Sequence, residues 1–360
     1  MDRSPPDFDR EGHAVPSILG TGLVALDFVF KDGVFFGAWA GGTCGNVLTA
    51  LALLGWHSYP IARLSMDAAG ERVKADLGRW HVRADFLSCP PAAATPIVVE
   101  NLTTSAEGHG HHAFSWNCPR CGAKLPRHKP ITEYATDAVG DGTLGSSVFF
   151  MDRLSPASLA LATRARSDGA LVMWELAAER DPALLDAALA IVHILKYARE
   201  RAALVPVDKA AIVDLEICTL GENGLRFRSS LPNAATAEWT SVSGFRPNVV
   251  VDPCGAGDWC TAGLLSAIGV GGYAAFKQLS HDELLTALRY SQAMAAWSCA
   301  FVGPRGGMYT RTRQQLLGDV RAIIAGDSPP ALSTLSTTKS MTQGYGCPLC
   351  SERDRGSQQQ

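Results

Sequence analysis

Apolar and polar positions along this chain follow the periods of strands and helices taken in turn. The apolar segment 17–30 (SILGTGLVALDFVF) predicts a buried first strand with glycine breaks that ends near Asp27. Residues 45–54 are apolar all round, which indicates a helix packed on a sheet, and Gly55 is placed to end it. A short strand at 58–67 and a helix at 68–82, with its charges on one side, continue the alternation.

The same alternation resumes over residues 146–268 and predicts a mostly parallel sheet with helices on both faces. One such sheet indicates one main domain, residues 17–326. Residues 93–136 lack a helical period and predict a small β excursion or lid. Residues 1–16 and 327–360 are predicted to be tails, the first disordered, because both are polar or proline-containing and lack periodicity.

Composition and charge narrow the class of protein. Hydrophobic residues make up 47% of the 360 positions, enough for a large core. The 32 Lys and Arg against 35 Asp and Glu leave no basic field, which argues against nucleic acid as the main partner. Without an apolar run of membrane length or a basic leader, we expect a cytoplasmic protein with no membrane partner. The ten cysteines are scattered, as for reduced thiols in a large chain.

The segment 248–268 (NVVVDPCGAGDWCTAGLLSAI) carries the strongest chemical signal. It predicts an apolar strand, a Gly-Ala-Gly turn and a helix. Gly255, Ala256 and Gly257 allow backbone N–H groups to face outward at a helix N-terminus, where the helix dipole favours an anion. Asp258, on the first turn, is placed to accept a proton from a hydroxyl that attacks a phosphoryl group. The alternative is that Asp258 only caps the helix.

The sequence DPCGAGD resembles the D-T-x-G-A-G-D signature of the ribokinase (PfkB) carbohydrate kinase family, and the resemblance extends over roughly residues 17–325. It implies an α/β fold with a ribokinase-like three-layer arrangement, helices on both faces of the sheet and a small β lid. The implied activity is ATP-dependent phosphoryl transfer to a hydroxyl of a sugar or sugar-containing small molecule. Asp258 would then be the base, Gly255–Gly257 the anion hole, and Asp252 a residue that helps to organise Mg²⁺.

Further stretches match the same family in the expected order. Asp27, followed by the AGGTCGN stretch, is similar to the family's substrate-binding region, and CTLGENGLRF is similar to the T-x-G-x-x-G hairpin near the nucleotide. The candidate substrate residues are Asp27, Gly41, Gly42 and Asn46, and the candidate nucleotide residues are Asp252, Thr219, Gly221 and Gly224. Each match also has a structural explanation, since Asn caps helices and Gly forms turns and hairpins.

Several family positions are altered. Where the family has N-x-x-E, this chain has Ala198 and Arg201, and Pro253 replaces the Thr of the signature. Glu175 is the nearest carboxylate where many members carry F-D-x-N. A catalytically weak, kinase-like ligand-binding or regulatory protein is therefore the alternative function.

Two C-x-x-C pairs suggest a structural metal. Cys118 with Cys121, and Cys347 with Cys350, supply the four thiolates of a tetrahedral Zn²⁺ site, within one chain or between the two chains of a homodimer. The alternatives are a redox pair or unrelated thiols. A protein that serves mainly as a zinc-dependent interaction module is a third, weaker reading.

The histidine-rich stretch EGHGHHAF contains His109, His111 and His112. These imidazoles are candidates for contact with an anionic substrate or for metal ligation. The alternative, a solvated loop, is the more frequent role of such a stretch.

Overall fold

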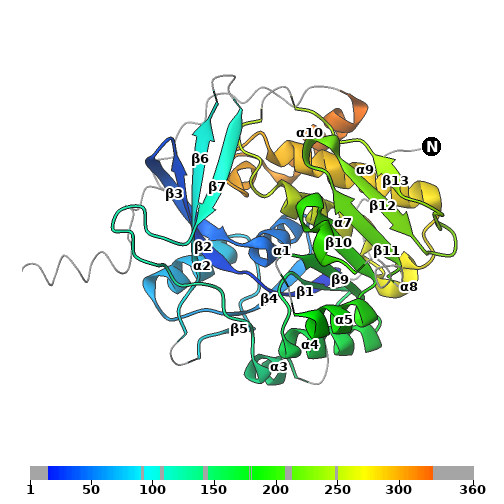
Figure 1. Cartoon of the computed structure of the whole chain (residues 1–360), viewed down its shortest axis with the longest axis horizontal. Coiled ribbons are helices and arrows are strands. Elements are labelled where there is room, and N and C mark those ends of the chain that lie inside the picture. The colour runs from blue at the N-terminus through cyan, green and yellow to red at the C-terminus, as the bar shows by residue number, and fades with distance from the viewer. Residues whose placement is uncertain are drawn as a thin grey trace, which may run out of the picture.

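The computed structural model describes residues 15–90, 93–105, 109–140, 145–177, 179, 181–206, 213–247 and 250–326. These residues form a main sheet of nine strands and a lid sheet of four (Figure 1). No helix within these ranges is long and apolar enough to cross a membrane. The strands of the main sheet are, in spatial order, β13 (Thr240–Val242), β12 (Leu225–Ser229), β11 (Leu215–Thr219), β10 (Ile194–Ala198), β9 (Leu171–Leu176), β8 (Val148–Met151), β1 (Ser17–Thr21), β4 (His57–Arg63) and β5 (Leu87–Ser88).

The main sheet is parallel from β11 to β5, and the hairpin strands β12 and β13 are antiparallel additions at one edge. The central strands VFFM and LVMWEL are buried along their whole length. Such continuous apolar runs are expected of parallel strands that are covered on both faces.

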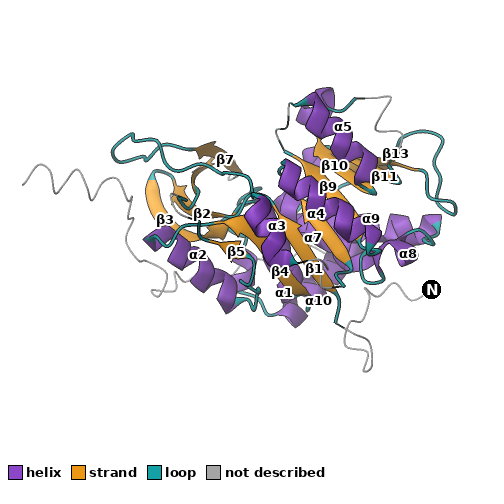
Figure 2. Ribbon diagram, turned by 90° about the horizontal axis from the view of Figure 1, so that it is seen from below, coloured by secondary structure: helices purple, strands orange, loops and turns teal. Residues whose placement is uncertain are grey.

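Alternate side chains of β8 belong to two different hydrophobic clusters, one on each face of the sheet. Val148 and Phe150 join the cluster of one helical layer, whereas Phe149 and Met151 join that of the other. Helices lie on both faces of the main sheet (Figure 2). The first layer contains α1 (Thr43–Leu53), α7 (Ala256–Ile268), α8 (Gly272–Phe276), α9 (His281–Ser298) and α10 (Arg313–Ala325). The second contains α3 (Glu133–Val139), α4 (Pro156–Ser167) and α5 (Pro182–Ile191).

The lid sheet stands beside the main sheet and is larger than the excursion at 93–136 predicted from the sequence. Its order is β3 (Val34–Gly41), β2 (Ala25–Lys31), β6 (Ile97–Thr104) and β7 (Gly110–Ser115), and α2 (Ala68–Arg79) packs against β2 and β3. The lid thus takes half of its strands from the N-terminal part of the chain.

The prediction of a single first strand that ends near Asp27 is wrong, because this segment forms β1 in the main sheet and β2, which continues to Lys31, in the lid sheet. The chain changes sheets after Gly22, whose φ is 145°. A Cβ on Gly22 would meet the Asp152 carboxylate at 1.6 Å, so only glycine fits at this bend. The strand predicted ahead of the Gly-Ala-Gly turn is also absent from the described part, residues 250–254.

The order of connections reverses at β1, which pairs with β4 on one side and with β8 on the other. In open α/β sheets, ligands bind at such a switch point, outside the carboxyl ends of the strands. Two hydrogen bonds join the end of β1 to the residue after β8. The Asp152 N–H donates to Thr21 O at 3.2 Å, and the Leu23 N–H donates to Asp152 Oδ1 at 2.9 Å.

Candidate active site

The N-terminus of α7 forms the cradle that the sequence predicts. Gly255 is its N-cap residue, with a left-handed φ of 78°, and a Cβ there would meet Pro304 at 2.5 Å. At Gly257 a Cβ would be accommodated without a clash, in ordinary van der Waals contact with Glu175 Oε1 and Lys196 Nζ at 3.8 Å. The first N–H groups of a helix lack intrahelical acceptors, so this turn suits an anion.

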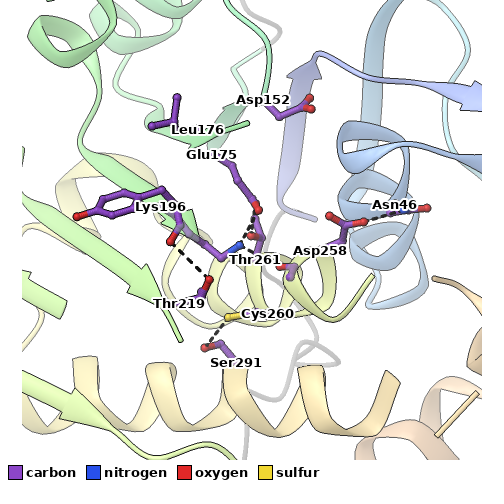
Figure 3. Close-up of polar contacts among 12 residues, drawn as sticks. Asn46, Asp152, Glu175, Leu176, Lys196, Thr219, Asp258, Cys260, Thr261 and Ser291 are labelled. Atoms are coloured by element: carbon purple, nitrogen blue, oxygen red, sulfur yellow. Dashed lines mark hydrogen bonds and ion pairs between the residues drawn. The ribbon is translucent and has the colours of Figure 1, made fainter. Parts of the chain in front are cut away.

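Asp258 lies on the first turn of α7 and faces α1 (Figure 3). Its Oδ2 accepts a hydrogen bond of 2.7 Å from Asn46 Nδ2. Burial, followed by the negative charge of Glu175, raises the pKa of Asp258 to about 8, although Asn46 and Lys196 oppose the shift. A carboxyl group with a raised pKa at the end of an anion cradle is suited to accept a proton near neutral pH.

A buried ion pair lies behind the cradle. Lys196 Nζ is 2.7 Å from Glu175 Oε1 and also donates to the Gly257 carbonyl at 3.1 Å (Figure 3). The second oxygen of Glu175 accepts a 2.6 Å hydrogen bond from Thr261 on α7. This network joins β9 and β10 to the start of α7 and therefore fixes the cradle relative to the sheet.

The four predicted substrate residues gather at the start of α1 and the adjacent part of the lid sheet. Gly41 has no room for a side chain, because a Cβ would meet Asp27 Oδ2 at 1.7 Å. Gly42 is the N-cap residue of α1, and Asn46 is buried on its first turn. The structure therefore brings Asp27 and Asn46 to the same region, and Asn46 contacts Asp258 directly.

Asp27 is a buried carboxyl group with one oxygen, Oδ1, that has no hydrogen-bonding partner among the described residues. Burial raises its pKa to about 7, and the Arg305 charge and the Gly42 backbone oppose the shift. Together with Trp39 and Tyr309 it lines a small cavity. An unsatisfied buried acceptor beside a cavity is suited to a hydroxyl donor on a ligand.

Arg305 is the positive group behind Asp27, and sequence reasoning did not identify it. It is buried, donates to the Ala40 carbonyl and pairs with Asp76. Tyr309 donates to the same carboxylate at 2.9 Å. This network ties the loop after α9 to β3 and α2, so it stabilises the wall of the cavity.

The predicted nucleotide hairpin forms between β11 and β12, at the edge of the main sheet. Gly221 and Gly224 have φ values of 62° and 90°, and a Cβ on Gly224 would meet Val242 O at 2.2 Å. Thr219 Oγ1 donates to Tyr197 O at 3.5 Å, at the end of the neighbouring strand β10. A turn of 3₁₀ helix, Gly221–Asn223, connects the two strands.

The 3₁₀ helix after β10 brings positive charge to the site. Arg201, in the 3₁₀ helix Arg199–Leu204, donates to the Leu176 carbonyl at 3.1 Å. Asp152 is buried and pairs with Arg153 at 2.6 Å. Burial raises the pKa of Asp152 to about 6, with the Arg153 charge and, more weakly, the Arg201 charge opposing the shift.

Asp252, predicted to help organise Mg²⁺, is fully buried and uses both oxygens within the protein. They accept hydrogen bonds from Cys254 N at 2.9 Å and Gly303 N at 2.7 Å. This arrangement holds the segment before the cradle against the loop after α9. A role for Asp252 toward magnesium stays a prediction.

The first C-x-x-C pair forms a compact turn. The Cys121 N–H donates to Cys118 Sγ at 3.4 Å, and the Gly122 N–H donates to Cys118 O at 2.8 Å. Cys347 and Cys350 lie outside the described residues. The zinc site therefore stays a prediction.

Asp152, Lys196 and Glu100 are candidate site residues that sequence reasoning missed. A charged residue inside or directly after an apolar strand, as in VFFMDR, HILKYA and IVVENL, is the signal that identifies them. Burial and the neighbouring Asp252 carboxylate raise the pKa of Glu100 to about 9. Such perturbed groups cluster at functional sites.

No protein-family model and no curated protein sequence matches the chain. Solved structures do match over most of its length. A ribokinase from Giardia lamblia has a TM-score of 0.66 at 14% identity, covering 86% of this chain and 99% of that one. Aminoimidazole riboside kinase from Salmonella enterica, complexed with aminoimidazole riboside and an ATP analog, has a TM-score of 0.62 at 18% identity, covering 86% and 99%. A Burkholderia thailandensis nucleoside kinase in complex with inosine has a TM-score of 0.62 at 20% identity, covering 87% and 98%.

These likenesses establish the fold class. The chain has the ribokinase-like α/β fold, with helices on both faces of a largely parallel sheet and a β lid beside it.

Proposed function

We propose that this protein transfers the γ-phosphoryl group of ATP to a hydroxyl of a sugar or sugar-containing small molecule, with Asp258 as the general base. The observation that carries the proposal is the position of the Asp258 carboxylate, beside the cradle of α7 and 2.7 Å from Asn46. The matched structures, which include a ribokinase and nucleoside kinases, favour this activity over others built on α/β folds.

Each part of the site has a role in this reaction. The N–H groups at the start of α7 stabilise the charge that develops on the transferring group. Asp258 accepts the proton of the attacking hydroxyl, and Asp27 with Asn46 orients the substrate. Lys196 holds the Gly257 carbonyl, and with it the cradle, in place.

Magnesium fits this site as an ion carried by the nucleotide. Arg153 and Lys196 already pair with Asp152 and Glu175, so little uncompensated carboxylate remains for a resident ion. Mg²⁺ commonly binds through substrate phosphates and one or two carboxylates, and Asp252 is the residue predicted to help to organise it. The ion would neutralise charge on the phosphates.

A turnover screen tests the proposal. Purified wild-type protein with ATP and Mg²⁺ is incubated with a panel of sugars and nucleosides, and ADP formation is measured together with the thermal midpoint. We expect at least one compound both to raise the midpoint and to be phosphorylated. If ligands raise the midpoint and no compound accepts a phosphoryl group, the kinase proposal is wrong.

A ligand-binding or regulatory protein with weak catalysis is the second candidate. The observation that favours it is Arg201, which places a cation where the family's N-x-x-E motif has its glutamate, and which already bonds to the Leu176 carbonyl. Binding without turnover in the same screen is the result that this candidate predicts.

We further propose a structural zinc ion held by Cys118, Cys121, Cys347 and Cys350, with the turn at Cys118 as the supporting geometry. Elemental analysis of the full-length protein should find zinc, and Cys118→Ser should contain less zinc per chain than wild type, whereas Cys89→Ser should match wild type. Wild-type protein without zinc would contradict the assignment. The mass of the assembly measured with and without a chelator tells an intrachain site from one shared by two chains.

A further inference from the structure

A second cluster of potential ligands lies where the lid sheet meets the segment that leads into the cradle. Glu100 comes from β6, His112 from β7 and Asp252 from the segment before Gly255. Their ligand atoms all lie within 4.8 Å of one another. His112 Nδ1 is 3.9 Å from Asp252 Oδ1, too far for a direct hydrogen bond.

Glu100 is the feature that points to a missing partner. Its side chain is 0% exposed, and neither carboxylate oxygen has a hydrogen-bonding partner of ordinary geometry among the described residues. The Cys254 thiol and the Asp252 carboxyl group lie close enough to interact with it, but neither supplies a positive charge. Nδ1 of His112 is likewise buried and unpartnered within this part of the chain. Buried carboxylates are normally paired or bound to metal, because removing an unpaired charge from water is costly.

The strand register directs these groups to the same place. His112 pairs with Leu102, two residues along β6 from Glu100, so both side chains lie on one face of the lid sheet. His111 points to the opposite face and is exposed. Asp252 Oδ1 accepts one backbone hydrogen bond and retains a second lone pair.

The two parts of the chain that carry the cluster are already docked. The Gly110 N–H at the start of β7 donates to Val250 O at 2.9 Å. A Cβ on Gly110 would meet Val251 O at 2.0 Å, so only glycine permits this approach. This close contact between backbones therefore fixes the positions of β7 and of the segment that carries Asp252 relative to each other.

We propose that Glu100, His112 and Asp252 form a binding site for a divalent transition-metal ion of the Mn²⁺ or Zn²⁺ class, which joins the lid sheet to the segment that leads into the cradle. One imidazole with two carboxylates suits these ions, whereas Mg²⁺ favours oxygen ligands alone. Three protein ligands leave further coordination positions for water or a ligand. The ion restrains the lid beside the cavity at Asp27. This assignment does not depend on the proposed phosphoryl transfer.

Mn²⁺ is the probe of choice, because thiolates select softer metals and the cysteine pairs will not compete for it. Nucleotide-free, full-length protein is titrated with Mn²⁺, and the free ion is followed by electron paramagnetic resonance. We expect wild type to bind one ion that Glu100→Gln and His112→Gln each weaken by roughly tenfold or more. His111→Gln, on the other face of the same strand, should bind as wild type does, as should Asp258→Asn.

Equal affinity in wild type, Glu100→Gln and His112→Gln overturns the assignment, as does the absence of binding to wild type at millimolar Mn²⁺. Equal affinity would mean that the ion binds elsewhere. No binding to wild type would mean that Glu100 and Asp252 share a proton in place of a metal ion. If a variant fails to fold, the titration of wild type with Mn²⁺ and the pulsed spectra of the bound ion test the assignment without it. Pulsed spectra of bound Mn²⁺ must show coupling to an imidazole nitrogen, and spectra without this coupling exclude His112 as a ligand.

Discussion

Asp258→Asn is expected to fold, to bind ATP and substrate, and to transfer phosphoryl groups roughly 10²–10⁴-fold more slowly than wild type. Asparagine has nearly the same shape, and its carbonyl oxygen accepts the hydrogen bond that Asn46 now gives to the carboxylate. The amide cannot accept the proton of the substrate hydroxyl, so the effect falls on kcat. Steady-state kinetics with the substrate found by screening measure it, and a variant with wild-type kcat would remove Asp258 from the mechanism.

The pH profile provides the control for this variant. Because the pKa of Asp258 is raised to about 8, its active carboxylate form is depleted as the pH falls below this value. Wild-type kcat/KM should therefore rise with pH toward 8, and the residual activity of Asp258→Asn should lack this rise.

The contribution of Asp258 to the free energy of unfolding changes with pH in the opposite direction to kcat/KM. A carboxyl group whose folded pKa is raised stabilises the fold below its unfolded pKa, and this contribution is lost as the pH rises through the folded pKa. The thermal midpoint of Asp258→Asn should accordingly equal or exceed that of wild type at pH 8. A variant that is less stable than wild type at pH 8 would mean that Asp258 has a structural role.

Lys196→Met is expected to lower the free energy of unfolding by about 3–5 kcal/mol. The side chains of Lys196 and Glu175 are only 2% and 11% exposed, so removal of the lysine leaves a buried carboxylate without its counter-charge. Burial is the largest single influence and lowers the pKa of Lys196, but the attraction of Glu175, its hydrogen bond and the nearby Cys260 and Asp258 together raise it, so the lysine is charged in wild type. Urea unfolding followed by circular dichroism measures the change.

The double variant Lys196→Met/Glu175→Gln is the matched control. It removes both charges and keeps an acceptor for the Thr261 hydroxyl, so it should recover most of the lost stability. If the single and double variants are equally unstable, the cause is the packing of the lysine stem or its bond to Gly257 O, and the buried-charge explanation fails.

Much of the fold could be predicted from local pattern. Residues 45–54 and 68–82 form α1 and α2 close to the predicted limits, because helix periodicity and caps are read over a few residues. The parallel sheet with two helical layers follows in the same way from the alternation of elements. The bend at Gly22 was missed, because an apolar run looks the same whether its strands lie in one sheet or in two.

The sequence by itself determined the parts of the site that are local. The Gly-Ala-Gly turn, the helix N-terminus and Asp258 are contiguous, so their geometry follows from backbone preferences of a few residues.

Only the tertiary structure decided which distant charges meet. Lys196 reaches Glu175 because the two residues are register partners on the parallel strands β10 and β9. Glu100, His112 and Asp252 converge because β6 and β7 present one face toward the segment before the cradle. A slip of one residue in either register would turn these side chains to the opposite face, and register is set by the packing of the whole sheet.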